Sequence, residues 1–385
     1  MDVFTALSSD AHDDSLSPAI SMKIRVVDMH TSGEPTRIVV QGYPELRGST
    51  LLEKRADARD RLDHVRQLLM KEPRGHSEMY GAILVWETEW TAVGRADVGV
   101  LFCHNEGYST MCGHATIALG RFLVDMAEGA FLARIRSRIE DGWTTVNLHA
   151  PCGIVEVTVP VTPQGRADAT RPVTFLSVPS FVGGTDICVE IPAEKMWKQM
   201  KESGKQRVKV DVAFGGAFYV IVDVRELGFG DGLLASSVPE LAQAAKTIKG
   251  LVGNKTEVLK HPSERDLEYL YGVIISDEGV PGDDVECGLC FFADEQIDRS
   301  PTGSGVCARV ALAVANGVRK VGERRVYESI YSMRHPGSGF AGTAVEEVTM
   351  PDGRSGVTVR VSGKAHYVAA TTFVLETGDG WKHGL

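Results

Sequence analysis

Two segments of this chain carry a reactive side chain in the same local pattern. One reads Met111-Cys112-Gly113-His114 and the other reads Pro301-Thr302-Gly303-Ser304. In each, a polar loop ends in a side chain of nucleophile type, and a glycine and an apolar run of helical character follow. The first N–H groups of a helix lack partners within the helix and lie at the positive end of its dipole, so they bind anions. We therefore expect the two segments to hold one carboxylate between two helix ends.

The two segments differ where Cys112 aligns with Thr302. A free thiol has a pKa near ~8.5, and a helix N-terminus favours the thiolate, so a cysteine at this position is a plausible base. A threonine hydroxyl is closer to water, whose pKa is ~15.7, so Thr302 can only donate, accept or position. Racemisation needs proton exchange on both faces of a carbon. One base on one face favours elimination instead.

Three other segments accompany the pair. They are residues 28–37, 73–82 and 214–219, which read DMHTSGEPTR, PRGHSEMYGA and FGGAFY. Together with the pair they resemble the motifs of the proline racemase family, whose paired positions read Met-Cys-Gly-His and Ser-Pro-Cys-Gly. The resemblance runs from about residue 23 to residue 376 and so covers nearly the whole chain. Threonine at the second cysteine position is similar to the pattern of family members that dehydrate trans-3-hydroxy-L-proline.

The resemblance implies a role for each matching residue. Cys112 would remove the Cα proton of the substrate, with Thr302 as its catalytic partner. His114 and Asp298 would flank the ring nitrogen, and Asp298 lies four residues before Thr302, as the family pattern requires. The backbone groups that would hold the substrate carboxylate belong to Gly113, His114, Gly303 and Ser304.

Each of these residues also has a simpler interpretation. Cys112 alone could be a buried thiol, and His114 alone a core or surface histidine. Asp298 could occupy a solvated turn or cap a helix, and Thr302 could be a helix N-cap. The internal repeat and the flanking motifs favour the functional interpretation, and capping by Thr302 would also direct its hydroxyl toward a ligand.

Metal binding is the main alternative arrangement. The residues that suggest it are Cys103, His104, Cys112 and His114, and the Cys-x-x-Cys pair Cys287 and Cys290. A structural zinc site usually needs two such pairs at a regular spacing, and the strand expected at residues 98–103 should carry Cys103 and His104 away from the helix start. Cys287 and Cys290 lie in a segment that continues as strand, which disfavours a thioredoxin-like role. We expect no metal, and we interpret these two thiols as core residues.

The sequence also indicates no nucleotide cofactor. Gly303-Ser304-Gly305 contains a Gly-x-Gly, but the third glycine of a dinucleotide fingerprint is absent, as is a Walker lysine followed by Ser or Thr. Proton abstraction would then depend on the bound carboxylate, the ring nitrogen and a tuned thiol.

Three functions remain open. The favoured one is cofactor-independent dehydration of trans-3-hydroxy-L-proline, giving an enamine that tautomerises to 1-pyrroline-2-carboxylate. The second is a racemase or epimerase of proline or hydroxyproline, with a water in place of the second thiol. The third is a catalytically silent protein that binds an amino acid on the same scaffold.

The composition is typical of a soluble enzyme. The net charge of −10 disfavours nucleic acid and anionic membranes as partners, and no apolar stretch reaches the ~18 residues that a membrane span needs. Seven cysteines, an odd number, suit a reducing compartment, so we expect the cytoplasm. Residues 1–21 are acidic and rich in Ser and Ala, without the marks of a targeting signal, and we expect a disordered tail there.

The remaining sequence predicts an α/β (α+β) protein with two pseudo-symmetric domains. Strand-like runs alternate with a few helices, and the second half repeats the elements of the first. We expect a first domain over residues 22–165, a polar break at 163–172, and a second domain over 166–364. By resemblance, each would be a curved, mostly antiparallel sheet around one central helix, as in proline racemase and diaminopimelate epimerase. Strands at about 365–385 would return to the first domain, the site would lie between the domains, and the chain would form a homodimer.

Overall fold

The computed structural model describes residues 20–385 except residues 127 and 283. The tail expected at residues 1–21 therefore lies outside the described residues, except for its last two positions, which begin the first strand. The chain forms two compact units. The first comprises the residues up to Ser109, His114–Val173 and Lys364–Leu385, and the second comprises Thr110–Gly113 and Thr174–Gly363.

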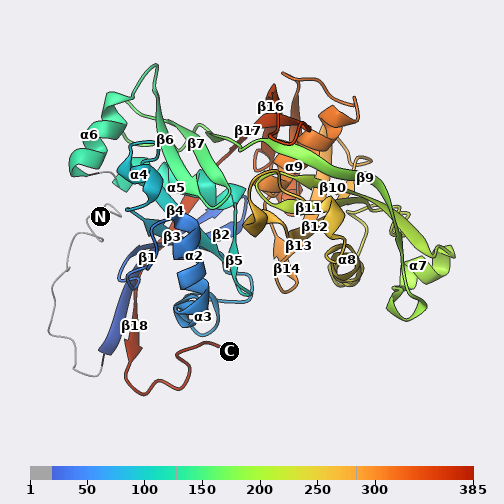
Figure 1. Cartoon of the computed structure of the whole chain (residues 1–385), viewed down its shortest axis with the longest axis horizontal. Helices are drawn as coiled ribbons and strands as arrows, with labels where there is room; N and C mark the ends of the chain where they lie inside the picture. Colours follow the sequence, from blue (N-terminus) through green and yellow to red (C-terminus); the bar gives the residue numbers. More distant parts are fainter. Residues whose placement is uncertain (1–19, 127, 283) are drawn as a thin grey trace. The chain divides into compact units, whose positions relative to one another are not determined.

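The first unit is a curved sheet with helices on it. Its strands are β1 (Ile20–Thr31), β2 (Glu34–Gln41), β3 (Gly81–Val85), β4 (Val98–Cys103), β5 (Tyr108–Ser109), β6 (Trp143–Ala150), β7 (Gly153–Pro160) and β18 (Ala365–Glu376). Its helices are α2 (Leu51–Asp60), α3 (Asp63–Met70), α4 (Glu89–Ala92), α5 (Gly113–Met126) and α6 (Gly129–Ser137). The strands pair in the order β18, β1, β2, β3, β4, β6 and β7. Figure 1 shows the first and last strands of the chain, β1 and β18, side by side.

The second unit contains the remaining elements. Its strands are β8 (Val173–Leu176), β9 (Ser180–Glu190), β10 (Arg207–Phe214), β11 (Phe218–Asp223), β12 (Leu270–Asp277), β13 (Val285–Phe292), β14 (Gln296–Asp298), β15 (Arg324–Glu328), β16 (Phe340–Thr349) and β17 (Ser355–Gly363). Its helices are α7 (Lys198–Ser203), α8 (Val238–Val252) and α9 (Gly303–Ala315), with four 3₁₀ turns, η1 (Ala193–Lys195), η2 (Thr256–Val258), η3 (Arg265–Leu267) and η4 (Ser332–Arg334).

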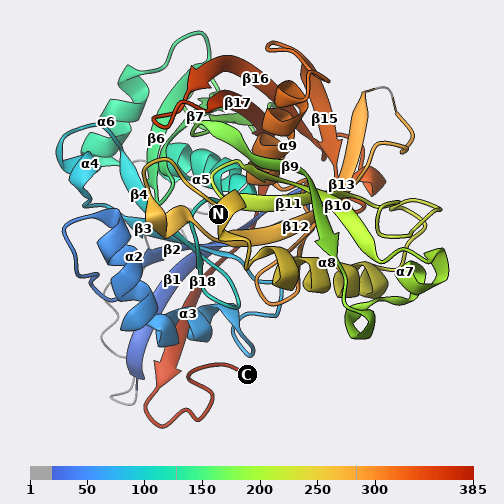
Figure 2. The ribbon, with the colours of Figure 1, turned by 45° about the vertical axis from the view of Figure 1, so that its right-hand side comes forward.

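The strands of the second unit close into a ring around α9. They pair in the order β9, β10, β11, β12, β13, β15, β16 and β17, and β17 pairs again with β9. Helix α9 packs against β9, β10, β11, β16 and β17 (Figure 2). Its first ten residues are all buried, including the polar Ser304 and the charged Arg309.

The two units repeat one pattern of strand pairing. In the first, the pairs are antiparallel except β2 with β3 and β4 with β6. In the second, they are antiparallel except β11 with β12 and β13 with β15, at the same places in the order. The buried helices α5 and α9 follow the short strands β5 and β14. The predicted α/β class, with mostly antiparallel sheets and a repeated arrangement, is confirmed.

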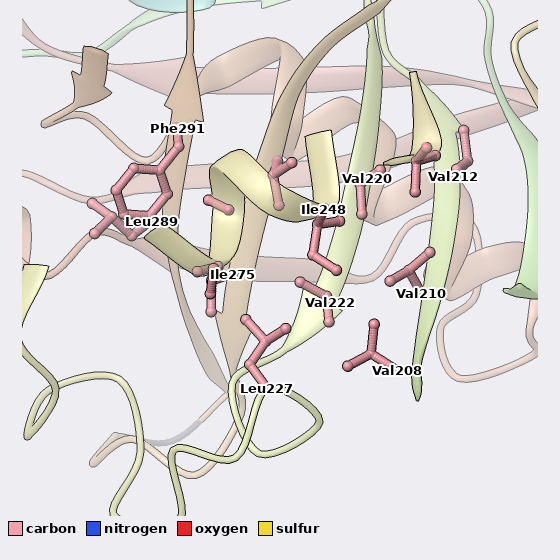
Figure 3. Close-up of a cluster of buried hydrophobic side chains, with 14 of the residues drawn as sticks. Val208, Val210, Val212, Val220, Val222, Leu227, Ile248, Ile275, Leu289 and Phe291 are labelled. Carbon is pink, nitrogen blue, oxygen red and sulfur yellow. The ribbon is translucent and has the colours of Figure 1, made fainter. Parts of the chain in front are cut away.

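An outer apolar layer fixes the sheet of the second unit. Figure 3 shows valines of β10 and β11 facing Ile248 of α8, with Ile275 of β12 and with Leu289 and Phe291 of β13 in the same cluster. Side chains alternate between the two faces of a strand, so the residues between these positions face the other way, toward α9. For example, a Cβ built on Gly288 would lie 2.6 Å from a guanidinium nitrogen of Arg309 on α9.

The charged, amphipathic pattern of residues 51–70 predicts one long helix, and that prediction is wrong. The segment forms α2 and α3, because the backbone leaves the helical region at Leu62. Leu62 is buried, and the Arg61 guanidinium bonds back to Asp57. The break lets α3 turn Val65 and Leu68 into the core of the first unit. Among the helices that the structure describes, none has both the length and the apolar character needed to cross a membrane.

Candidate active site

Cys112 ends the short loop between β5 and α5, and the loop belongs to the second unit. The Cys112 side chain is 4% exposed. Two residues earlier, the Thr110 hydroxyl donates a 2.8 Å hydrogen bond to the carbonyl of Gly216, in the turn between β10 and β11. The same turn contacts the start of α9, because a Cβ built on Gly215 would lie 2.1 Å from the carbonyl oxygen of Ser304. The Phe-Gly-Gly motif at 214–216 therefore connects the Cys112 loop to the first turn of α9.

The first residues of α5 and α9 are in direct backbone contact. A Cβ built on Gly113 would lie 2.4 Å from the Cα of Gly303. In the opposite direction, a Cβ on Gly303 would lie 2.7 Å from the Cα of Gly113. Any larger residue at either position would push the two segments apart. Glycine is required here for close approach, as expected where backbone meets backbone.

A chain of hydrogen bonds sets the loop that carries Thr302. The Ser300 amide donates to Oδ1 of Asp298 at 2.8 Å, and the Thr302 amide donates to the Ser300 hydroxyl at 3.1 Å. From α9, the Arg309 guanidinium donates to the carbonyl of Pro301 at 2.8 Å. Asp298 is thereby held at the end of β14 and Thr302 at the start of α9. Both side chains are buried.

Thr302 has an unfavourable backbone conformation for a β-branched residue. Its φ of 62° and ψ of 86° lie in the left-handed region. It occupies the N-cap position of α9, but its side chain makes no capping hydrogen bond. The simple N-cap interpretation is therefore wrong about its hydroxyl, which interacts instead with the buried thiol of Cys290. Strained residues of this kind concentrate at functional sites.

Ser304 connects the first turn of α9 to a fully buried tyrosine. Its hydroxyl lies 2.7 Å from the hydroxyl of Tyr219 on β11. Burial raises the pKa of Tyr219 well above its ordinary value, and the nearby Cys290, Asp298 and Cys112 add to this effect. The Tyr219 phenol therefore stays neutral and acts as a hydrogen-bond partner. Because Cys112 and Asp298 both act on Tyr219, the three side chains belong to one cluster in the second unit.

His114 is grouped with the first unit, directly after Gly113. Its carbonyl accepts a 2.9 Å hydrogen bond from the Thr31 hydroxyl. Its ring meets the ring of Tyr80 edge to face, with 4.8 Å between the centroids. Thr31 and Tyr80 come from the segments 28–37 and 73–82 that accompanied the reactive pair. Those two motifs therefore support the residue that follows the cysteine loop.

Sequence reasoning identified six residues that the structure brings together in the second unit. They are Cys112, Gly113, Asp298, Thr302, Gly303 and Ser304. It missed Tyr219 and Cys290 as members of the group. The motif at 214–219 was a signal for Tyr219. Cys290 had only its position in a Cys-x-x-Cys pair, which suggested a different function.

The structure separates that cysteine pair. Residues three apart on a strand face opposite sides of the sheet, so Cys287 packs in the outer core while Cys290 faces α9. Burial raises the pKa of Cys287 to about 12, and it raises the pKa of Cys103 to about 12. Within residues 20–385 as described, no three His, Cys, Asp or Glu side chains gather in a way that could hold a metal ion.

Comparison with known proteins identifies the class. The model of the family described as proline racemase matches residues 26–385. The chain belongs to the proline racemase family, as its motifs predicted. A solved structure of a hydroxyproline epimerase from Agrobacterium vitis, with bound trans-4-OH-L-proline, has the same fold, with a TM-score of 0.76 and 22% identity over 94% of this chain and 95% of that one.

Individual relatives are more similar in sequence. The chain is 43% identical to the human protein named trans-3-hydroxy-L-proline dehydratase over 363 residues, which are 94% of each chain. It is 35% identical to the protein of Burkholderia multivorans named 3-hydroxyproline 2-epimerase, over 95% of this chain and 98% of that one.

Proposed function

We propose that this chain is a cofactor-independent hydro-lyase that removes water from trans-3-hydroxy-L-proline. The observation that carries the proposal is the unequal pair of reactive loops in the second unit, with a thiol at Cys112 and a hydroxyl at Thr302. A thiolate can abstract a proton at neutral pH and a threonine hydroxyl cannot. The more similar of the two relatives named above is a dehydratase acting on this substrate.

The substrate carboxylate would bind to the backbone N–H groups of Gly113, His114, Gly303 and Ser304. The first N–H groups of an α-helix have no intrahelical partner, and such groups stabilise the charge that develops on a carboxylate when Cα is deprotonated. His114 and Asp298 would bind the ring nitrogen. These contacts lower the energy of the carbanion-like transition state without any bound metal or cofactor.

The reaction then proceeds by proton transfer and loss of the hydroxyl. The Cys112 thiolate takes the Cα proton, and the electron pair of that C–H bond forms a double bond between Cα and C3. The C3–O bond breaks, and the departing hydroxide takes the proton back from the Cys112 thiol and leaves as water. The resulting enamine moves a proton from nitrogen to C3 and becomes 1-pyrroline-2-carboxylate. The atoms and charges balance with a single thiol as base.

Incubation of the purified chain with trans-3-hydroxy-L-proline and with L-proline tests the proposal. Dehydration predicts an imine product from the first substrate and no change in the optical rotation of the second. An epimerase or racemase would change optical rotation without forming imine. A binding protein without activity would do neither, and either result would overturn the proposal.

We further propose that the enzyme works in the cytoplasm as a homodimer. All seven cysteines are free thiols in the structure, a state that suits a reducing compartment. Dimerisation is an expectation from the family. Size-exclusion chromatography coupled to light scattering should give twice the mass of the 385-residue chain.

A further inference from the structure

Cys290 occupies a special position on β13. Its neighbours Leu289 and Phe291 point into the outer core beneath α8, so Cys290 points to the opposite face, toward α9. In the sheet, Cys290 is the direct partner of Asp298, on β14. It is 1% exposed. The thiol therefore lies beside the loop that carries the reactive hydroxyl.

The register of β13 and β14 places the thiol of Cys290 close to the loop of Thr302, and the two side chains interact. The Thr302 hydroxyl makes no bond to the helix that it precedes, and the left-handed backbone of Thr302 directs its side chain away from the usual capping direction. The second reactive loop carries a threonine where the family pattern has a cysteine, and a thiol from another strand lies beside that threonine.

We propose that Cys290 accepts a hydrogen bond from the Thr302 hydroxyl and, as a positioning residue, thereby prevents proton delivery to the second face of Cα. The proposal rests on the function proposed above. When the hydroxyl donates to Cys290, only its oxygen lone pairs face the bound ring. The carbanion then has no acid on the Thr302 side, so it loses the C3 hydroxyl rather than accepting a proton with inversion.

The environment of Cys290 keeps the thiol in this supporting role. Burial raises its pKa well above the ordinary value, and the neighbouring Asp298 raises it further. A neutral thiol cannot serve as a base at physiological pH. Cys290 therefore does not replace the missing second catalytic cysteine, and its contribution is a hydrogen bond.

The test compares Cys290→Ala with Cys290→Ser in deuterium oxide. In Cys290→Ala the Thr302 hydroxyl is released and can protonate Cα, regaining its proton from water. We expect kcat for dehydration to fall about tenfold with KM changed less than about threefold, and deuterium with inverted Cα to accumulate in recovered substrate. Cys290→Ser keeps a hydrogen-bond partner for the Thr302 hydroxyl. It should therefore retain the wild-type ratio of Cα exchange to dehydration.

Cys287→Ala is the matched control, because it removes a buried thiol from the same strand on the opposite face. It should lower the melting temperature and leave the ratio of exchange to dehydration unchanged. An equal change of that ratio in Cys287→Ala, or wild-type kcat and ratio in a folded Cys290→Ala, would overturn the proposal. If Cys290→Ala does not fold, Cys290→Ser takes its place in the test. A rise in the ratio of Cα exchange to dehydration in Cys290→Ser, as large as its loss of kcat, would overturn the proposal as well.

A second measurement does not depend on activity. The Raman S–H stretch of Cys290, identified by its absence in Cys290→Ala, should shift when Thr302→Val removes the hydroxyl. An unshifted band would refute the hydrogen bond on which the inference depends, whether or not the wild type dehydrates its substrate. If the wild type does not dehydrate its substrate but the band shifts, the proposed function is refuted and the hydrogen bond between Cys290 and Thr302 is still supported.

Discussion

Gly113 and Gly303 touch each other through their backbones, at the first residues of α5 and α9. The space between them does not admit one additional carbon atom, since a Cβ on Gly113 would lie 2.4 Å from the Cα of Gly303. Neither glycine has a positive φ, so glycine is required at these two positions for lack of space and not for its backbone conformation. This contact sets how closely the residue before each glycine, Cys112 or Thr302, can approach the other.

Gly113→Ala should therefore damage catalysis more than stability. Separation of the two segments by even 1 Å would move the Cys112 sulfur away from the Cα proton of the substrate. A displacement of this size costs about 10²-fold in kcat/KM. The strain of overpacking should lower stability by about 1–3 kcal/mol. Kinetic assays and urea unfolding measure the two effects. Gly230→Ala is the control, because nothing lies within 4 Å of a Cβ at that position, and equal kinetic losses in both variants would refute the steric explanation.

Cys112→Ser should abolish turnover while the fold persists. Serine is close in size to cysteine, but its hydroxyl gives no useful base at neutral pH, so we expect kcat to fall by at least ~10³-fold. Circular dichroism and calorimetric titration with L-proline should show an intact fold and retained binding. Cys188→Ser is the control, because that thiol is exposed and outside the site. Retention of a tenth of the activity would count strongly against Cys112 as the base.

Thr302→Cys should give the enzyme a base on the second face of Cα. We expect solvent deuterium to enter the Cα position of L-proline, with inversion, provided that the loop keeps its geometry. Thr302→Ala should lower dehydration by only about tenfold, because Thr302 positions the ring and does not take the proton. Mass spectrometry of recovered proline measures the exchange.

The neighbouring Cys290 requires a control in that experiment. A cysteine at position 302 would lie beside the sulfur of Cys290, so oxidation of the two thiols could hide the new activity. The double variant Thr302→Cys with Cys290→Ala, assayed with a reductant, removes this difficulty. Complete absence of deuterium in proline from both variants would mean that the rest of the pocket decides between elimination and racemisation.

The sequence predicted the α/β class and the residues of the two reactive loops, because both depend on local patterns. The loop before each central helix is a short motif, and repetition of that motif revealed the pair. The alternating apolar residues of 207–213 likewise predict a strand, which is β10 in the structure. The same kind of information could not reveal the break at Leu62, where tertiary packing of Val65 and Leu68 overrides a continuous helical pattern.

Features that depend on long-range pairing were missed. Strand β9 contains Gly183, Gly184 and an Asp186 with a φ of 51°, so it shows no alternation, and it forms by pairing with β10. The role of Cys290 depends on the register between β13 and β14, which places it beside Asp298. No local pattern contains that register. A thiol that reads as a core residue in sequence therefore belongs to the candidate site in the structure.

Acid should destabilise the second unit through His261. Burial lowers the pKa of His261 from 6.5 to about 4, with Arg354 adding to the effect. Between these values the unfolded chain binds a proton that the folded chain does not, so stability falls as the pH falls from 6.5 toward 4. For this partly exposed ring we expect a loss of about 1 kcal/mol between pH ~7 and ~5.5. Urea unfolding of His261→Gln should show a smaller loss, and an unchanged pH dependence would remove His261 as its source.

The stereochemistry of the substrate gives the most direct test of a mechanism with one base. In trans-3-hydroxy-L-proline the hydroxyl lies opposite the carboxylate, so it shares a ring face with the Cα proton, and the two must leave from the same side. The Cys112 thiol on that face could take the proton and return it to the departing hydroxyl, so one residue would serve as base and then acid.

In the cis-3-hydroxy isomer the hydroxyl points to the face proposed for Thr302, where no group could deliver that proton. We therefore expect the cis isomer to inhibit competitively and to lose water at least ~10²-fold more slowly than the trans isomer. Initial rates for the two isomers, with the inhibition constant of the cis form, measure this difference, and equal rates would require a separate acid near Thr302 or Asp298.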